Sequence, residues 1–143
     1  NTDKTKVPGW FWLIAVIGLI WNLMGVGAYL GQAMIGPEAL EAMPEDQRLM
    51  LENRAAWAVA AFAVAVWGGT IASILLLFRK AIAESIFIIS FIGIIVQMIY
   101  NLFVSEYTMD YGPAEIVMTI MIPLFGLLLI WVARKMKANG WAR

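Results

Sequence analysis

The sequence contains neither cysteine nor histidine, and only 14% of its 143 residues are charged. Without these two residue types, the chain has no thiolate or imidazole metal site, no cysteine nucleophile, no axial histidine for haem and no Ser-His-Asp triad. Disulfides are excluded as well, so cysteine usage says nothing about the redox compartment. Most familiar catalytic chemistry is therefore closed to this chain, and we expect no enzymatic activity, no cofactor and no metal site.

Charge is also missing from the middle of four long apolar runs. Hydrophobic residues make up 62% of the chain and the mean hydropathy is +0.80, whereas soluble domains are roughly 45–50% apolar. At about 1.5 Å per helical residue, each run is long enough to cross a hydrocarbon core of roughly 30 Å. The runs cover residues 10–31, 57–78, 85–104 and 116–133. They predict an all-α polytopic membrane protein with four transmembrane helices in a single domain, residues 1–143.

The first run and the polar stretch that follows it need separate interpretations. The first run is longer than the roughly 7–15 apolar residues of a signal peptide and lacks a clear cleavage site at its end, so we expect a retained helix. Residues 36–54 are the only long polar stretch. In it, Pro37 and Pro44 are each followed by acidic residues, which is typical of helix starts. Its apolar residues would face the membrane, so we predict an extracytoplasmic amphipathic segment between the first two spans.

The charges outside the apolar runs are divided unequally between the two sides of the membrane. The N-terminus, residues 79–84 and the C-terminal tail hold eight basic and two acidic residues, whereas residues 36–54 and 105–115 hold two basic and eight acidic ones. Since lysine and arginine stay cytoplasmic, both termini are expected inside and both long loops outside. Glu84 lies at a span end, where a local ion pair with Arg79 or Lys80, or the helix dipole, explains it. Without a deep carboxylate, a proton-coupled pump is not expected.

Amide and aromatic side chains recur at helical spacing in the first and third spans, on one face of each. One interpretation is hydrogen bonding between helices, which contributes about 0.6–2 kcal/mol per contact. The alternative is a solute site, because amides both donate and accept hydrogen bonds and aromatic rings stack on a polyhydroxylated molecule. The candidate solute-binding residues are Trp21, Asn22, Tyr29, Gln97, Tyr100 and Asn101.

Small residues form a stripe along the second span. Ala58, Ala61, Ala65, Gly68 and Ala72 are spaced three or four apart. Such stripes let helix backbones approach closely in lipid. In an accessory subunit, this stripe would dock on a larger membrane complex.

Several segments resemble those of small bacterial four-span inner-membrane proteins that are loosely labelled "sugar transporter". These segments are WNLMGVGAYL, GPEALEAMPEDQR, AWAVAAFAVAVWGG, ILLLFRK and IVQMIYNLF, so the resemblance covers nearly the whole chain. It brings no binding residues of established role. Two better-defined families do not match. The small multidrug exporters carry a membrane-embedded glutamate in their first helix, which has no acid here, and the half-size sugar facilitators have three spans and a Pro-Gln motif.

The resemblance implies a location in the bacterial inner membrane and movement of a small neutral solute such as a sugar. The alternative is a non-catalytic accessory subunit of a larger membrane complex. Four helices enclose little volume, so a permeation route needs a homo-oligomer or a membrane partner protein. Beyond these, the expected partners are the lipid bilayer and the solute, and no nucleic acid.

Overall fold

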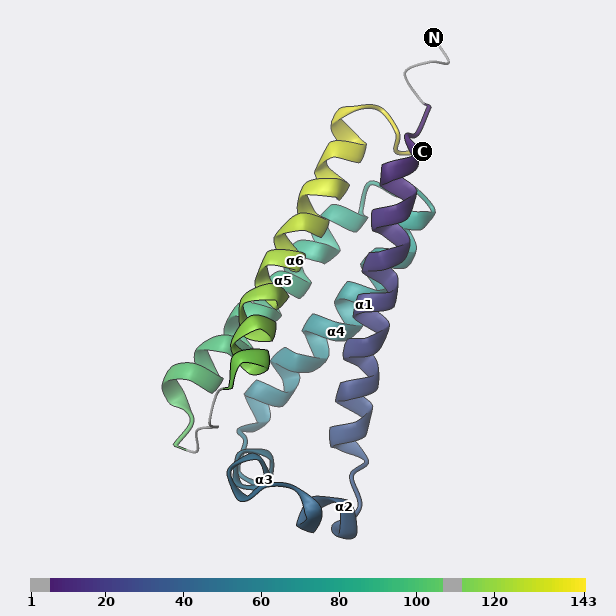
Figure 1. Ribbon diagram of the computed structural model, residues 1–143. Coiled ribbons are helices and arrows are strands. Elements are labelled where there is room, and N and C mark those ends of the chain that lie inside the picture. Colours follow the sequence, from purple (N-terminus) through teal and green to yellow (C-terminus); the bar gives the residue numbers. More distant parts are fainter. Residues whose placement is uncertain (1–5, 107–111) are drawn as a thin grey trace.

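The computed structural model describes residues 6–106 and 112–143 (Figure 1). Over these residues the elements are, in order, α1 (Gly9–Ala33), α2 (Pro37–Ala42), α3 (Glu45–Glu52), α4 (Ala56–Leu77), α5 (Ala83–Ile99), a π-helical turn η2 (Tyr100–Val104) and α6 (Pro113–Ala138). Four helices, α1, α4, α5 continued by η2, and α6, are long and apolar enough to cross a membrane. No strand occurs within the two described ranges. The predicted fold class of an all-α polytopic membrane protein is confirmed.

The fourth span is longer than hydropathy predicted. It starts at Pro113, where proline occupies the first helical turn and Glu115 adds a negative charge near the positive end of the dipole. It continues to Ala138 because Lys135 and Lys137 in its last turn suit the negative end of the helix. Pro123 lies inside the helix without ending it. The loop predicted at 105–115 lies partly outside the described residues.

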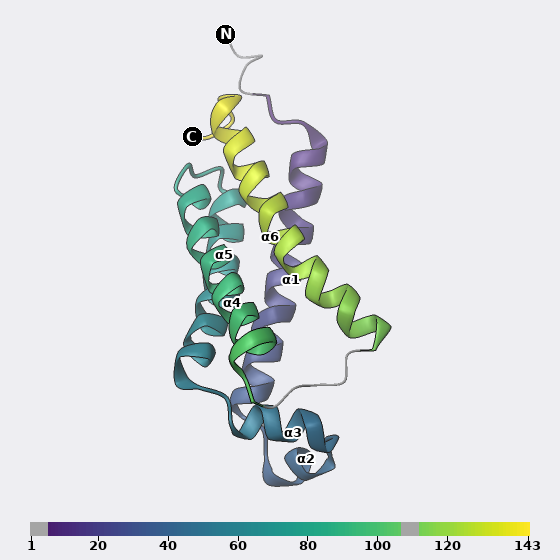
Figure 2. The same cartoon turned by 90° about the vertical axis from the view of Figure 1, so that its left-hand side faces the viewer.

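The spans pack in chain order, α1 against α4, α4 against α5 and α5 against α6, while α1 and α6 make few contacts. The C-terminus, the start of α1 and the α4–α5 turn lie at one end of the bundle, which we call the termini end (Figure 1). Helices α2 and α3 lie at the opposite end, the loop end. Toward the loop end α6 moves away from α1 in both views (Figures 1 and 2). The helices are therefore gathered at one end and spread at the other.

The closest helix contact joins α4 to α5 and uses the small-residue stripe of α4. Ala61, Ala65 and Ala72 are buried, and a Cβ added to Gly93 of α5 would lie 2.8 Å from the carbonyl oxygen of Ala61. The two backbones meet without side chains between them. Since this stripe is used within the chain, it is not a free surface for docking on a larger complex.

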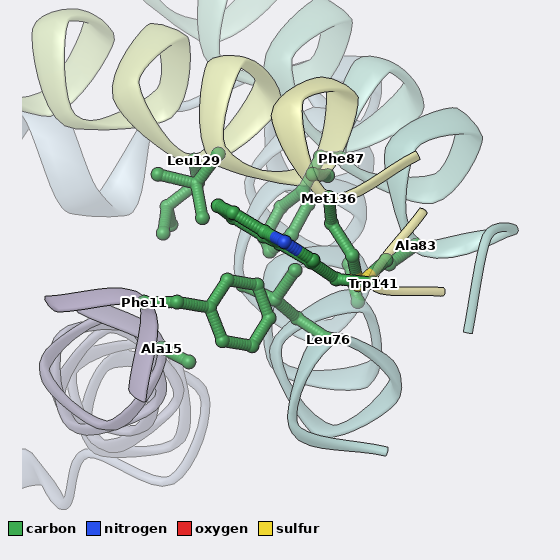
Figure 3. Close-up of a cluster of buried hydrophobic side chains, with 11 residues drawn as sticks. Phe11, Ala15, Leu76, Ala83, Phe87, Leu129, Met136 and Trp141 are labelled. Carbon is green, nitrogen blue, oxygen red and sulfur yellow. The ribbon is translucent and has the colours of Figure 1, made fainter. Parts of the chain in front are cut away.

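A core of aromatic and aliphatic side chains closes the termini end (Figure 3). Phe11 of α1, Leu76 of α4 and Met136 of α6 are each fully buried in it. After α6 ends, the chain folds back and inserts Trp141, whose ring centroid lies 5.8 Å from that of Phe11. The backbone N–H of Arg143 then donates to the carbonyl oxygen of Arg79 at 2.8 Å. All four spans are thus held together at this end.

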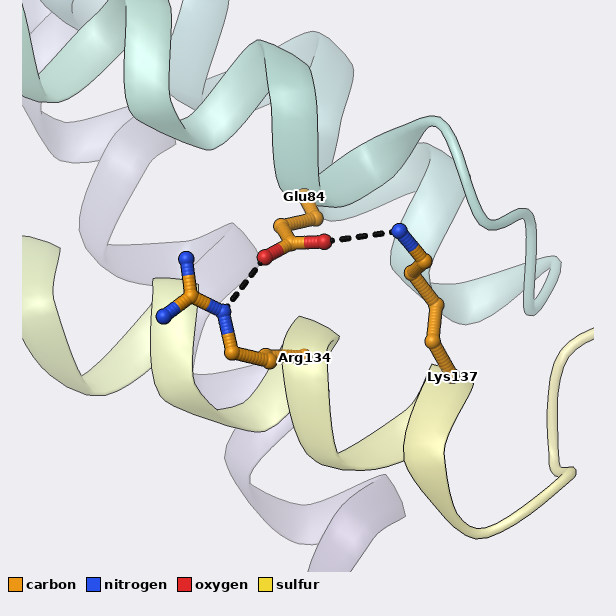
Figure 4. Close-up of polar contacts among 3 residues, drawn as sticks. All are labelled: Glu84, Arg134 and Lys137. Carbon is orange, nitrogen blue, oxygen red and sulfur yellow. Dashed lines mark hydrogen bonds and ion pairs between the residues drawn. The ribbon is translucent and has the colours of Figure 1, made fainter.

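Glu84 fastens the start of α5 to the end of α6 (Figure 4). Its carboxylate accepts a hydrogen bond from Nε of Arg134 at 2.6 Å and another from Nζ of Lys137 at 2.9 Å. The predicted partners, Arg79 and Lys80, were wrong. Sequence proximity suggested them, but the antiparallel return of α6 brings two cations from far along the chain to the same level.

Candidate functional site

A cavity of about 320 Å³ opens at the loop end, between α3 and the ends of three spans. Its size falls in the range of pockets that hold small molecules, roughly 300–1,000 Å³. Polar and apolar side chains share its wall. It is lined by Gln32, Met43, Gln47, Met50, Leu51, Arg54, Ala58, Gln97, Tyr100 and Asn101. Three of the six predicted solute-binding residues, Gln97, Tyr100 and Asn101, therefore lie together.

The π-helical turn η2 supplies part of this wall. Tyr100 and Asn101 are its first two residues, and Gln97 lies one turn earlier in α5. A π turn widens the helix by one residue and is rare in proteins, where it often marks a functional site. Its position at the end of the third span directs an aromatic ring and two amides to the same cavity.

The hydroxyl of Tyr100 also holds the wall in place. It accepts a hydrogen bond from the backbone N–H of Ala55 at 3.0 Å and donates to the carbonyl oxygen of Asn53 at 3.4 Å. Its ring packs edge-on against Trp57, with centroids 5.1 Å apart. Tyr100 thereby ties the link between α3 and α4 to the end of α5. Tyr100 lines the cavity, while its hydroxyl already has partners in the chain.

Arg54 and Gln32 were missed as site residues by sequence reasoning. Arg54 lies in the short link between α3 and α4, and its Nη1 donates to Oε1 of Gln32 at 2.7 Å. The two residues are far apart in sequence, but they flank the connection between the first two spans. This position was the available signal, because the end of one span and the start of the next must lie on the same side of a membrane.

Asn22 lies elsewhere, midway along α1, and is engaged with α4. Its Nδ2 donates to the carbonyl oxygen of Gly18 at 2.9 Å and to Oγ of Ser73 at 3.2 Å. The amide lies directly over Gly69, where any added Cβ would collide with it. These contacts agree with the first of the two interpretations of the amides in the sequence, that they form hydrogen bonds between helices.

Trp21 and Tyr29 are also separated from the loop-end cavity. Trp21 stacks on Phe125 of α6 with ring centroids 4.9 Å apart. Together with Asn22 it lines a second cavity of about 20 Å³, which has room for about one water molecule and none for a sugar. Tyr29 lines neither cavity and packs against Phe62 and Trp67 instead. The six predicted residues thus fall into three places rather than one.

The carboxylates Glu106, Asp110 and Glu115 belong to the loop predicted at 105–115. Asp110 lies outside the described residues. Among residues 6–106 and 112–143, no group of three carboxylates is placed to hold a metal ion.

Comparison with known proteins gives no relative for this chain. No protein-family model, curated protein or solved structure matches it. The geometry of the loop-end cavity is therefore the main indication of function.

Proposed function

We propose that this chain binds a small neutral polar solute, such as a sugar, in the loop-end cavity and moves it across the membrane. The observation that carries the proposal is the composition of the cavity wall. Amides of Gln97, Asn101 and Gln47 can each donate and accept hydrogen bonds, as sugar hydroxyls require. The ring of Tyr100 and the apolar side chains Met43, Met50 and Leu51 contact the less polar faces of such a molecule.

The proposed orientation places the loop end outside the cell and the termini end in the cytoplasm. The excess of lysine and arginine at the termini end favours this arrangement in a bacterial inner membrane. The cavity would then receive solute from the outer side. Beyond it, the space beside Trp21 and Asn22 is only about 20 Å³, so passage requires α6 to move or a second subunit to contribute to the route.

Binding and uptake in proteoliposomes test this proposal. We expect saturable uptake of at least one member of a panel of radiolabelled sugars. The double substitution Gln97→Leu, Asn101→Leu removes two amides from the cavity and should abolish uptake. Asn22→Ala should lower stability by about 1 kcal/mol through loss of its interhelical hydrogen bond, and should leave solute binding to the loop-end cavity unchanged.

The matched control is Thr119→Leu. Thr119 is a polar residue of α6 whose hydroxyl donates to the carbonyl oxygen of Glu115, and it lines neither cavity. This variant should transport normally. A folded natural protein that takes up no sugar, or a double variant that transports as well as the natural one, would contradict the proposal.

The alternative function is that of an accessory subunit in a larger membrane complex. The observation that favours it is the loop-end half of α6, where Ile116, Val117 and Ile120 are exposed and the buried residues all come later in the helix. A partner helix would cover this half. Co-purification of one defined partner at fixed stoichiometry in a mild detergent, lost in an Ile116→Arg, Ile120→Arg variant, would support this function.

A further inference from the structure

The loop-end cavity contains one charged residue, Arg54, among its ten lining residues. Its Nη1 donates a hydrogen bond to the neutral amide of Gln32. None of the ion pairs among residues 6–106 and 112–143 includes Arg54. A guanidinium has five N–H donors, and the bond to Gln32 uses one of them. Among the residues that the structure describes, the cavity wall therefore presents a cation without a carboxylate beside it.

The neighbouring Arg48 shows the contrast. It lies on α3, outside the cavity lining, and its Nε pairs with a carboxylate oxygen of Glu52 at 3.3 Å. The acidic side chains of α2 and α3 likewise do not line the cavity, and Glu38, Glu41 and Glu45 are exposed to the outside. Solvent and salt screen such exposed charges over about 8–10 Å. Of the charges in the described part of the chain, that of Arg54 is therefore the nearest to a bound molecule.

From this arrangement we infer that the cavity selects a small polyhydroxylated anion, a sugar acid or a similar hydroxy acid with one carboxylate. The planar guanidinium of Arg54 matches a carboxylate in two-point geometry, and the bond to Gln32 fixes its orientation. Gln47, Gln97 and Asn101 form hydrogen bonds with the hydroxyls of the same molecule. The inference rests on the proposed function, solute binding in the loop-end cavity, and replaces the neutral sugar proposed there by the corresponding acid.

Hydrogen bonds to a charged group are about twice as strong as those between neutral groups. For two sugars that differ only in this group, the acid should bind at least about tenfold more tightly than the neutral parent. D-glucose and D-glucuronate form such a pair, because they share the ring and differ at C6, which is a hydroxymethyl group in one and a carboxylate in the other.

The experiment measures binding of both sugars, and of glycerol 1-phosphate as a third probe, to the purified protein in lipid nanodiscs by isothermal titration calorimetry, at constant sodium concentration. The natural protein should prefer glucuronate by at least about tenfold. Arg54→Gln keeps an amide beside Gln32 and removes the charge, so the two sugars should bind it about equally. Arg48→Gln, the matched control, should keep the preference. Arg54→Lys, which retains the charge without the planar fork, should keep part of it.

Each outcome bears on one of the two proposals. Equal binding of glucose and glucuronate by the natural protein would overturn the choice of an anion and leave sugar binding intact. An unchanged preference in folded Arg54→Gln would show that another group selects the charge, and would also overturn it. Tighter binding of glycerol 1-phosphate than of glucuronate would assign the cavity to a phosphate ester, such as a lipid headgroup. Binding of none of the probes by the folded protein would count against the proposed function itself.

Discussion

At the termini end, Phe11, Leu76 and Met136 are fully buried, whereas at the loop end Phe103 of η2 is 81% exposed and Ile116 of α6 is 48% exposed. All these side chains are apolar, so lipid can solvate those that are exposed. In a bilayer the hydrophobic effect does not drive helices to associate, so packing and polar contacts must hold them together. In this chain those contacts are gathered at the termini end and along α4 and α5.

The difference between the ends has a functional meaning. The loop end holds a polar cavity of about 320 Å³ between α3 and the ends of α1, α4 and α5. The core and ion pairs at the termini end keep the bundle assembled while the other end stays open. Substitutions of the same chemical kind should therefore have unequal effects at the two ends.

The largest effect is expected for Phe11→Ala. Phe11 is fully buried among side chains from all the spans that form the termini-end core, so its removal leaves a cavity and should cost about 3–5 kcal/mol. The control is Phe103→Ala at the loop end, which should cost less than about 0.5 kcal/mol because that ring has few protein contacts. Unfolding by SDS in mixed micelles measures both. Similar losses for the two variants would remove the distinction between the ends.

A smaller loss is expected for Gly93→Val, which tests the α4–α5 contact between the two ends. The first added carbon would meet the Ala61 carbonyl oxygen at 2.8 Å and the Ala65 backbone nitrogen at 3.0 Å. The helices must separate, at a cost of about 1–3 kcal/mol. Gly27→Val is the matched control in α1, because a Cβ at Gly27 meets nothing within 4 Å. The same SDS titration compares them, and equal stability would mean that α4 and α5 are not in backbone contact.

The smallest effect is expected for Glu84→Gln at the termini end. The change removes two charge-assisted bonds, but Arg134 and Lys137 are largely exposed, with 64% and 47% of their side-chain surface accessible. Water and salt therefore compensate much of the loss, and about 1 kcal/mol remains. The difference from the natural protein should shrink between low and high salt. A difference that is independent of salt would point to packing rather than charge.

The sequence predicted the spans well because the bilayer itself imposes their length and apolarity. It also predicted that α4 would make close contact through its alanines. It did not predict which neighbour they would contact, because four apolar helices of similar pattern can be arranged in several ways. Glu84 shows the same limit. The basic residues nearest to it in sequence were predicted as its ion-pair partners, whereas its partners in the structure come from α6.

The candidate site was harder to predict, for two physical reasons. Helical spacing identified a shared face on α5, and Gln97, Tyr100 and Asn101 do lie together. Helical spacing does not show whether a polar residue lines a cavity or bonds to a neighbouring helix. Asn22, which bonds to Ser73, was therefore included among the candidate solute-binding residues. The contribution of Arg54 depends on how α3 folds back over the ends of the spans. That arrangement belongs to the tertiary structure, so it leaves no periodic pattern in the sequence.

Trp141 also determines when this protein can finish folding. Its ring packs against Phe11 in the first span, yet it is made almost a whole chain length later. At about 5–20 residues per second, synthesis separates the two on the order of ten seconds. During that interval α1 resides in the bilayer without its final partner. Assembly of the termini end must therefore wait until Trp141 has been made, and a nascent chain stalled before Trp141 should be an early substrate for membrane proteases.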